Sequence, residues 1–151
     1  MKAPKIIEDQ LNHFYNRIHH DRDNSIKIRN WCITIWLSLL ALVNSNQLNL
    51  SKLQVLILPL MAISIFWILD AYQYMFILLN ERRAREIEDA IVNEKYDPDH
   101  ANEYFLLRVA EVYSYKIKLK TFLRASFLSE TIVIFYLLLT IGTIIFQIIL
   151  K

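Results

Sequence analysis

Six positions near the C-terminus repeat at alternating spacings of four and three residues, and five of them carry hydrogen-bonding side chains. They are Ser129, Val133, Tyr136, Thr140, Thr143 and Gln147. This heptad spacing places them on one face of a helix, which we call the polar seam. A polar face on a lipid-embedded helix is expected to contact protein or water. The seam therefore predicts a pore lined by its five polar members in an oligomer, or dry packing between helices.

A second group of side chains has the chemistry to bind anions. Lys116, Lys120 and Arg124 follow one another at four-residue steps, within an arc of apolar residues. Basic residues on a packing face cost free energy unless they are paired or hydrated. They would form a positive vestibule above a pore, or they would reach lipid phosphates from the headgroup level.

Aromatic residues lie next to these cations, as in surfaces that stack bases and hold the phosphates of a short single strand. Basic amphipathic stretches beside membranes have the same composition, so the pattern is compatible with both uses. The candidate ligand-binding residues are Arg108, Tyr113, Tyr115, Lys116, Lys120 and Arg124.

Asp70 ends a long apolar run, so it is expected near the membrane interface. An ionisable residue at that depth is a functional candidate. The alternative is a carboxylate that pairs with an interfacial cation, such as Lys27 or Arg29.

Motifs for catalysis are missing from the sequence. We find no P-loop, nucleophile elbow, zinc-protease motif or plausible triad. His13, His19 and His20 lie near Asp21 and Asp23, but no metal-ligand spacing recurs among them. We therefore expect no enzymatic activity, no metal and no cofactor.

The elements that carry these residues are long helices, because the chain has one Gly and three Pro among 151 residues. Residues 131–150 contain no charge and are long enough to cross a bilayer. The apolar run 31–43 alone is too short to cross a bilayer, but a helix that extends through residue 50 would be long enough. We predict an all-α integral membrane protein with membrane helices over 31–50, 53–79 and 129–151.

The remaining segments are charged. Residues 1–30 form an amphipathic segment, with Ile7, Leu11, Phe14 and Ile18 at helical spacing. This segment lies on the membrane surface or packs on other helices. The second membrane helix continues without a breaker to about residue 93, and the third begins after the turn at 93–100. Residues 80–128 are therefore predicted to form a helical hairpin that extends from helices two and three. No cleavable signal peptide is expected, because residues 1–30 are polar and mixed in charge.

The distribution of Lys and Arg predicts the orientation. Residues 1–30 contain six and residues 80–130 contain nine, whereas the turn at 44–52 contains Lys52 alone. The positive-inside rule then places the N-terminus and the hairpin in the cytoplasm, and the C-terminus outside.

Residues 66–72, FWILDAY, followed by NERR at 80–83, resemble a motif of small bacterial membrane effectors of anti-phage defence, of the Hailong type. The resemblance covers about residues 60–90 and the general layout. It implies a homo-oligomeric ion channel in the inner membrane. It also implies a partner nucleotidyltransferase, whose oligonucleotide product would hold the channel shut through its cytoplasmic part.

The leading hypothesis is a gated, anion-favouring channel. Three crossings cannot enclose a pore, so a channel requires a homo-oligomer. The alternatives are a non-conducting adaptor that anchors a cytoplasmic partner, and a small toxin-like membrane disruptor.

Cysteine labelling in intact cells tests the predicted topology. A cysteine at position 48 should react with an impermeant reagent from outside, and one at position 98 should be protected, because positive segments stay in the cytoplasm. Labelling of position 98 from outside would overturn the three-crossing arrangement.

Overall fold

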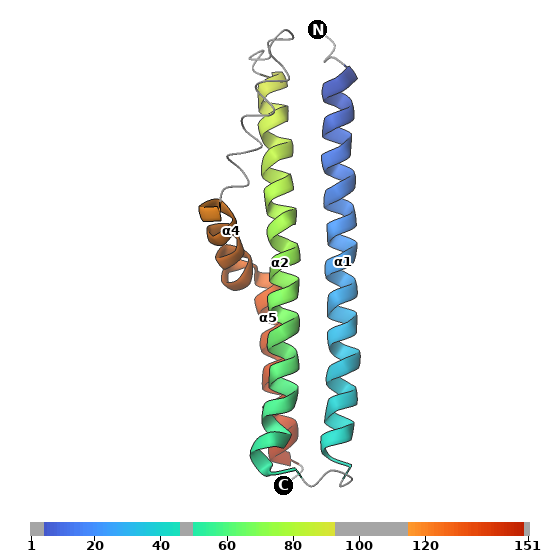
Figure 1. The fold of residues 1–151 in the computed structure, drawn as a ribbon, viewed down its shortest axis with the longest axis vertical. Coiled ribbons are helices and arrows are strands. Elements are labelled where there is room, and N and C mark those ends of the chain that lie inside the picture. Colours follow the sequence, from blue (N-terminus) through green and yellow to red (C-terminus); the bar gives the residue numbers. More distant parts are fainter. Residues whose placement is uncertain (1–4, 46–49, 93–114, 150–151) are drawn as a thin grey trace.

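The computed structural model describes residues 5–45, 50–92 and 115–149, and every regular element among them is a helix. Two very long helices, α1 (Lys5–Val43) and α2 (Lys52–Val92), run side by side as an antiparallel pair (Figure 1). They contain 39 and 41 residues. At about 1.5 Å per residue, each is roughly 60 Å long, about twice the hydrocarbon thickness of a bilayer.

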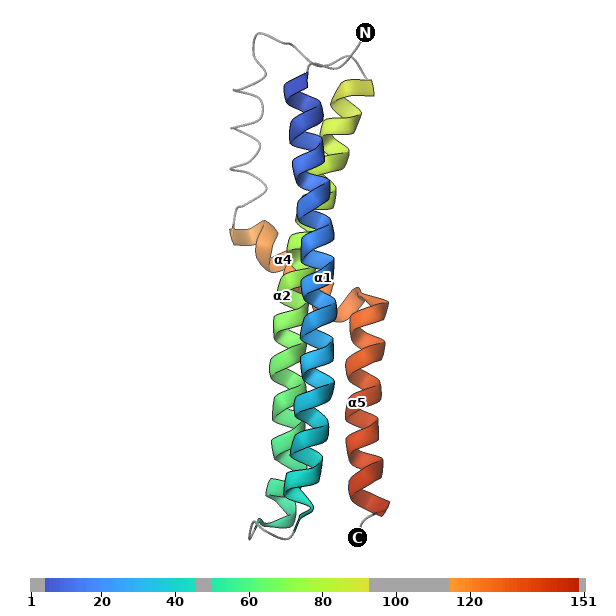
Figure 2. The ribbon, with the colours of Figure 1, turned by 90° about the vertical axis from the view of Figure 1, so that its right-hand side faces the viewer.

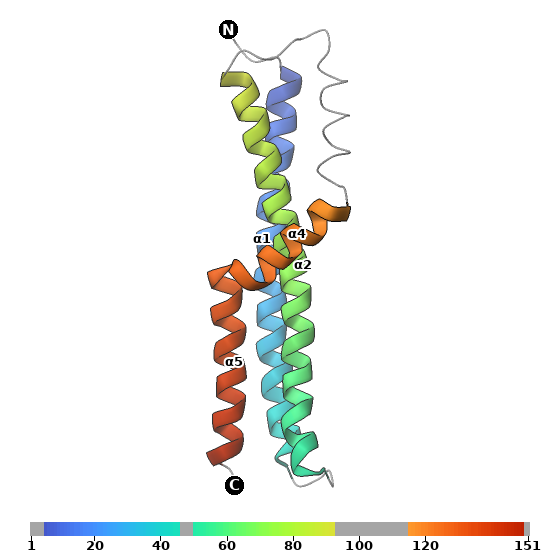
Figure 3. The same ribbon diagram turned by 90° about the vertical axis from the view of Figure 1, so that its left-hand side faces the viewer.

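Helix α5 (Glu130–Ile149) lies along only one half of this pair, beside the ends joined by the α1–α2 turn (Figure 2). The other half of the pair extends well beyond α5. Helix α4 (Tyr115–Leu128) has a different direction and crosses α2 obliquely, near the start of α5 (Figure 3).

Three helices are long and apolar enough to cross a membrane. The candidate spans lie within Asp9–Val43, Lys52–Asp89 and Glu130–Ile149. Helix α5 exposes large apolar side chains on one face, among them Ile134, Leu138 and Ile145. An outward apolar face on a helix of this length is typical of contact with lipid.

The N-terminal segment is part of the first long helix and packs on α2. Residues 5–43 form one continuous helix, so the predicted amphipathic segment and the first membrane helix are not separate elements. Ile18 is 3 % exposed, and Arg22 pairs with Glu81 of α2. Of the two alternatives for residues 1–30, the described part takes packing on another helix. Helix α1 ends at Val43, so its length comes from the N-terminal side rather than from an extension through residue 50.

The continuous helix expected after the turn at 93–100 is wrong in its described part. Helix α4 ends at Leu128 and α5 starts at Glu130, so Ser129 separates two helices of different direction (Figure 3). In the part of the chain that the structure describes, α2 packs on α1 in the half beyond α5 and also contacts α4 where that helix crosses it. Residues 93–114 of the predicted hairpin lie outside the described residues.

Heptad spacing explains how α2 binds its neighbour. Ile63, Asp70, Ile77 and Ala84 are each at most 2 % exposed and follow one another every seven residues. A seven-residue repeat keeps one face of a helix against a partner over many turns. Where α5 joins, Ile63 packs with three buried residues, namely Cys32, Ile132 and Tyr136. Where α4 crosses, Ala125 packs on Met75 and Leu79.

Gly142 provides a test of the α1–α5 contact. A Cβ at this position would lie 3.8 Å from the Trp36 ring, which is an ordinary contact distance. Gly142→Ala should therefore be tolerated and should stabilise the protein by up to about 1 kcal/mol, because Ala favours helix. Gly142→Leu should destabilise it by about 1–3 kcal/mol, because the larger side chain displaces the ring. Unfolding in mixed micelles measures both, and equal tolerance of Ala and Leu would contradict the contact.

Candidate functional site: a buried polar ladder between two helices

Among the described residues, the most buried charged group lies between α1 and α2. Asp70 is 0 % exposed, and Arg29 Nε donates a hydrogen bond to its Oδ2 at 2.7 Å. Ser25 donates its hydroxyl hydrogen to Oδ1 of the same carboxylate. The carboxylate is thus bonded on both oxygens, which a buried charge requires. Of the two cations expected to pair with Asp70, the structure selects Arg29.

A second carboxylate continues the same line of contacts toward the N-terminus of α1. Asp21 is 7 % exposed and accepts hydrogen bonds from Gln73 Nε2 at 2.8 Å and Asn80 Nδ2 at 3.2 Å. Together these six side chains form what we call the polar ladder. Its members are Asp21, Ser25, Arg29, Asp70, Gln73 and Asn80.

The sequence analysis singled out Asp70, with Arg29 as one of two alternative partners, but not the contacts of Asp21, Ser25, Gln73 and Asn80. The signal was the spacing: Asp21, Ser25 and Arg29 follow at four-residue steps, on the face of α1 that contains buried Ile18 and Cys32. A search for polar residues within apolar heptads of both helices would have paired them. The ladder has the geometry of a register device, since each of its two carboxylates accepts two hydrogen bonds from side chains of the other helix.

The polar seam of α5 faces the other helices of the same chain. Tyr136 is 2 % exposed and donates its hydroxyl hydrogen to the Phe66 carbonyl at 3.0 Å. Thr143 is 0 % exposed, and its Oγ1 accepts from Trp36 Nε1 at 2.8 Å. These are contacts of the packing alternative, made within one chain.

The other polar residues of the seam differ from Tyr136 and Thr143, which bond to other helices. Thr140 is half-buried and donates to the Tyr136 carbonyl at 2.9 Å. Gln147 is half-buried, and its Nε2 has no hydrogen-bond partner among the described residues. Ser129 lies in the break before α5 rather than within the helix, although its carbonyl accepts from Val133 N at 2.9 Å. A pore lined by the seam stays a prediction.

The three cations of α4 lie together on its exposed side. Lys116, Lys120 and Arg124 are all exposed, so in the described chain their face is not a packing face. The packing face is the opposite one, which contains Ala125 at 0 % exposure. Arg108 and Tyr113 lie outside the described residues, as does the side chain of Tyr115.

Arg124 borders a groove between α4 and the far half of α2. The groove has a volume of about 430 Å³, and its lining includes Arg82, Arg85 and Thr121 as well as Arg124. Arg82 pairs with Glu86 at 3.1 Å in the same groove, so part of its positive charge is already balanced.

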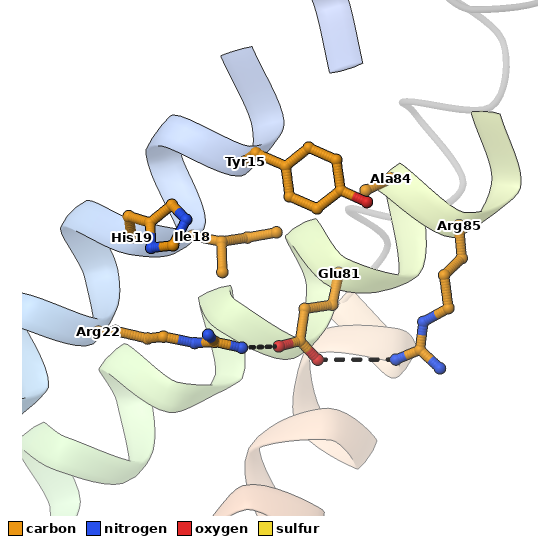
Figure 4. Close-up of a pocket in the computed structure, with 7 residues that line it drawn as sticks. All are labelled: Tyr15, Ile18, His19, Arg22, Glu81, Ala84 and Arg85. Atoms are coloured by element: carbon orange, nitrogen blue, oxygen red, sulfur yellow. Dashed lines mark hydrogen bonds and ion pairs between the residues drawn. The ribbon is translucent and has the colours of Figure 1, made fainter. Parts of the chain in front are cut away.

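A smaller pocket of about 300 Å³ lies between the far halves of α1 and α2 (Figure 4). Glu81 lies between two arginines there, at 2.7 Å from Arg22 and 3.6 Å from Arg85. At its rim Tyr15 donates to Glu88 Oε1 at 2.5 Å, and this bond, with burial and the charge of Glu88, raises the pKa of Tyr15. The bond therefore stabilises the fold below the ordinary tyrosine pKa of about 10 and is lost as the pH rises through the raised value.

No family model, curated protein or solved structure matches this chain. Among the residues described, no three His, Cys, Asp or Glu side chains gather as a metal would require.

Removal of Asp70 tests the ladder. Asp70→Leu leaves Arg29 without its carboxylate, so the free energy of unfolding should fall by about 3–5 kcal/mol. The double variant Arg29→Met/Asp70→Leu should recover most of this loss, because an apolar pair replaces the ions. The control is Arg82→Met, which breaks the exposed Arg82–Glu86 pair and should cost at most about 1 kcal/mol.

Unfolding of the purified protein by steric trapping in bicelles measures all three variants. A double variant as unstable as Asp70→Leu alone would show that the ion pair is not the coupled unit.

Proposed function

We propose that the chain is the subunit of a homo-oligomeric membrane channel, and that α1 faces the conducting path. The observation that carries this proposal is an exposed polar stripe on the membrane half of α1. Lys27, Asn30, Thr34 and Ser38 are all exposed and lie at spacings of three, four and four residues. In a membrane, such a face is expected to contact water or another subunit rather than lipid.

The direction of this stripe supports the proposal. At 100° per residue, the stripe lies on the side of α1 opposite Cys32 and Leu40, which are buried against the rest of the chain. Contacts within one chain therefore leave the stripe available. The seam of α5 is in the opposite situation, because Tyr136 and Thr143 already bond to other helices.

The stripe is compatible with a wet environment. Thr34 and Ser38 donate to backbone carbonyls one turn earlier, at 3.0 and 2.8 Å, so their oxygens remain available to accept from water. Lys27 lies at the entrance on the side of the α1 N-terminus. By the positive-inside rule this is the cytoplasmic side, and a ring of such lysines would favour anions.

Single-channel recording in planar bilayers tests the proposal. Ser38→Leu should lower the unit conductance at least severalfold, because it narrows and dries the path, while the oligomer keeps its size on gel filtration. The matched control is Ser64→Leu on α2, since Ser64 is also exposed and donates to a carbonyl one turn earlier at 2.9 Å.

Equal conductance of the Ser38→Leu and Ser64→Leu proteins would remove α1 from the path. Absence of any current from wild-type oligomers would reject the channel altogether.

The second candidate is a non-conducting adaptor. The far halves of α1 and α2 favour it, because they project beyond α5 and present the open pocket at Glu81 to a partner (Figure 4). An adaptor would pass no current, and Glu81→Gln would weaken capture of its partner without an effect on membrane insertion.

A further inference from the structure

We propose that α4 is an interfacial helix whose exposed basic row binds the headgroups of anionic phospholipids. The basic row consists of Lys116, Lys120 and Arg124. Beside it runs an apolar row at the same four-residue steps, Leu119, Leu123 and Phe127, with exposures of 46, 48 and 62 %. This inference concerns a surface that the proposed channel function does not use.

The opposite face of α4 is fixed on α2, so the two rows cannot turn inward. Ala125 packs on Met75 and Leu79 with no exposure. Trp67 Nε1 also donates to the Ser126 carbonyl at 3.1 Å. The exposed rows are therefore a permanent outer surface of the chain.

The connection to α5 sets the depth of α4. Only Ser129 separates Leu128 from Glu130, where a helix apolar enough to cross a membrane begins. The C-terminal end of α4 must then lie at the membrane surface. Because α4 crosses the long axis of the α1–α2 pair obliquely, it stays close to that surface as it extends away from α5 (Figure 3).

The two rows are also arranged in the correct order along the membrane normal. Phe127 contacts the Trp67 ring at 5.6 Å between centroids, and Trp67 precedes Asp70 on the side of α2 that leads into the bilayer. Arg124 instead borders the groove with Arg82 and Arg85, which lie farther along α2 on the aqueous side. These contacts place Phe127 toward the acyl chains and Arg124 toward the phosphates, which is the order of the two kinds of residue in interfacial amphipathic helices.

An anionic lipid fits this surface better than a soluble polyanion. Three large apolar side chains exposed beside the cations would remain in water if the ligand were a soluble strand, whereas a lipid covers both rows at once. Each Lys or Arg near an anionic leaflet strengthens association by about fivefold.

Lipid-selective quenching in nanodiscs tests the site with the intact protein. A fluorophore on Leu123→Cys, in a Cys32→Ser background, should be quenched by spin-labelled lipid, and more by spin-labelled phosphatidylglycerol than by spin-labelled phosphatidylcholine. The same fluorophore on Arg17→Cys, an exposed site on the far half of α1, should not be quenched.

Charge removal then tests the basic row. Lys120→Gln should reduce the preference for phosphatidylglycerol about fivefold. Arg17→Gln makes the same change in net charge and should leave the preference unchanged. Equal quenching at positions 123 and 17, or a preference that Lys120→Gln does not alter, would overturn the proposal.

A soluble polyanion is the competing outcome. If a short oligodeoxynucleotide binds to protein in phosphatidylcholine-only nanodiscs, and Lys120→Gln but not Arg17→Gln abolishes binding, the basic row is a site for that ligand instead of lipid.

Discussion

The buried carboxylate of Asp70 is the constraint on which the arrangement of the other helices depends. A charge without exposure must have its partners in fixed positions, and Ser25 and Arg29 provide them from α1. Arg29 also lies over the Phe135 ring of α5, at 5.8 Å from its centroid. One interaction therefore sets the register of α1 against α2 and brings α5 to the same level. A shift of α1 by one turn in either direction would leave the carboxylate with at most one of these two partners.

On the two sides of Asp70, different kinds of interaction hold the helices together. Toward the α1–α2 turn, apolar residues such as Cys32, Ile63 and Ile132 pack together, supplemented by hydrogen bonds such as Trp36 to Thr143. In a membrane these hydrogen bonds matter, because lipid is as apolar as the side chains. Burial of apolar surface alone therefore contributes little free energy to the association of helices. In the other direction, α1 and α2 continue beyond α5 with α4 packed across α2, and the rest of the ladder and exposed ion pairs such as Arg22–Glu81 hold α1 on α2. Among the described residues, contacts within the chain leave the polar stripe of α1 and the exposed rows of α4 uncovered.

Part of this arrangement could be predicted from the sequence. The uninterrupted pattern after residue 53 predicts α2, and the position of Asp70 next to an apolar run predicts its ion pair. The break at Ser129 could not be predicted, because neither Gly nor Pro marks it. Nor could the packing face of α4, because apolar residues on a helix near lipid can face either protein or acyl chains. The apolar arc that contains Lys116, Lys120 and Arg124 was expected to be a packing face, but its member Leu123 is 48 % exposed, whereas Ala125, too small to define a hydrophobic face, is fully buried.

Hydrogen–deuterium exchange in lipid nanodiscs tests most directly whether the buried carboxylate holds the long helices together. Amides of residues 10–29 should exchange as slowly as those of residues 30–43, because both belong to one helix packed on α2. In the Asp70→Leu protein, the amides of residues 10–29 should exchange much faster, while the amides of residues 130–149 should stay protected. Fast exchange of residues 10–29 in the wild-type protein, or protection that does not depend on Asp70, would contradict the central role of this carboxylate.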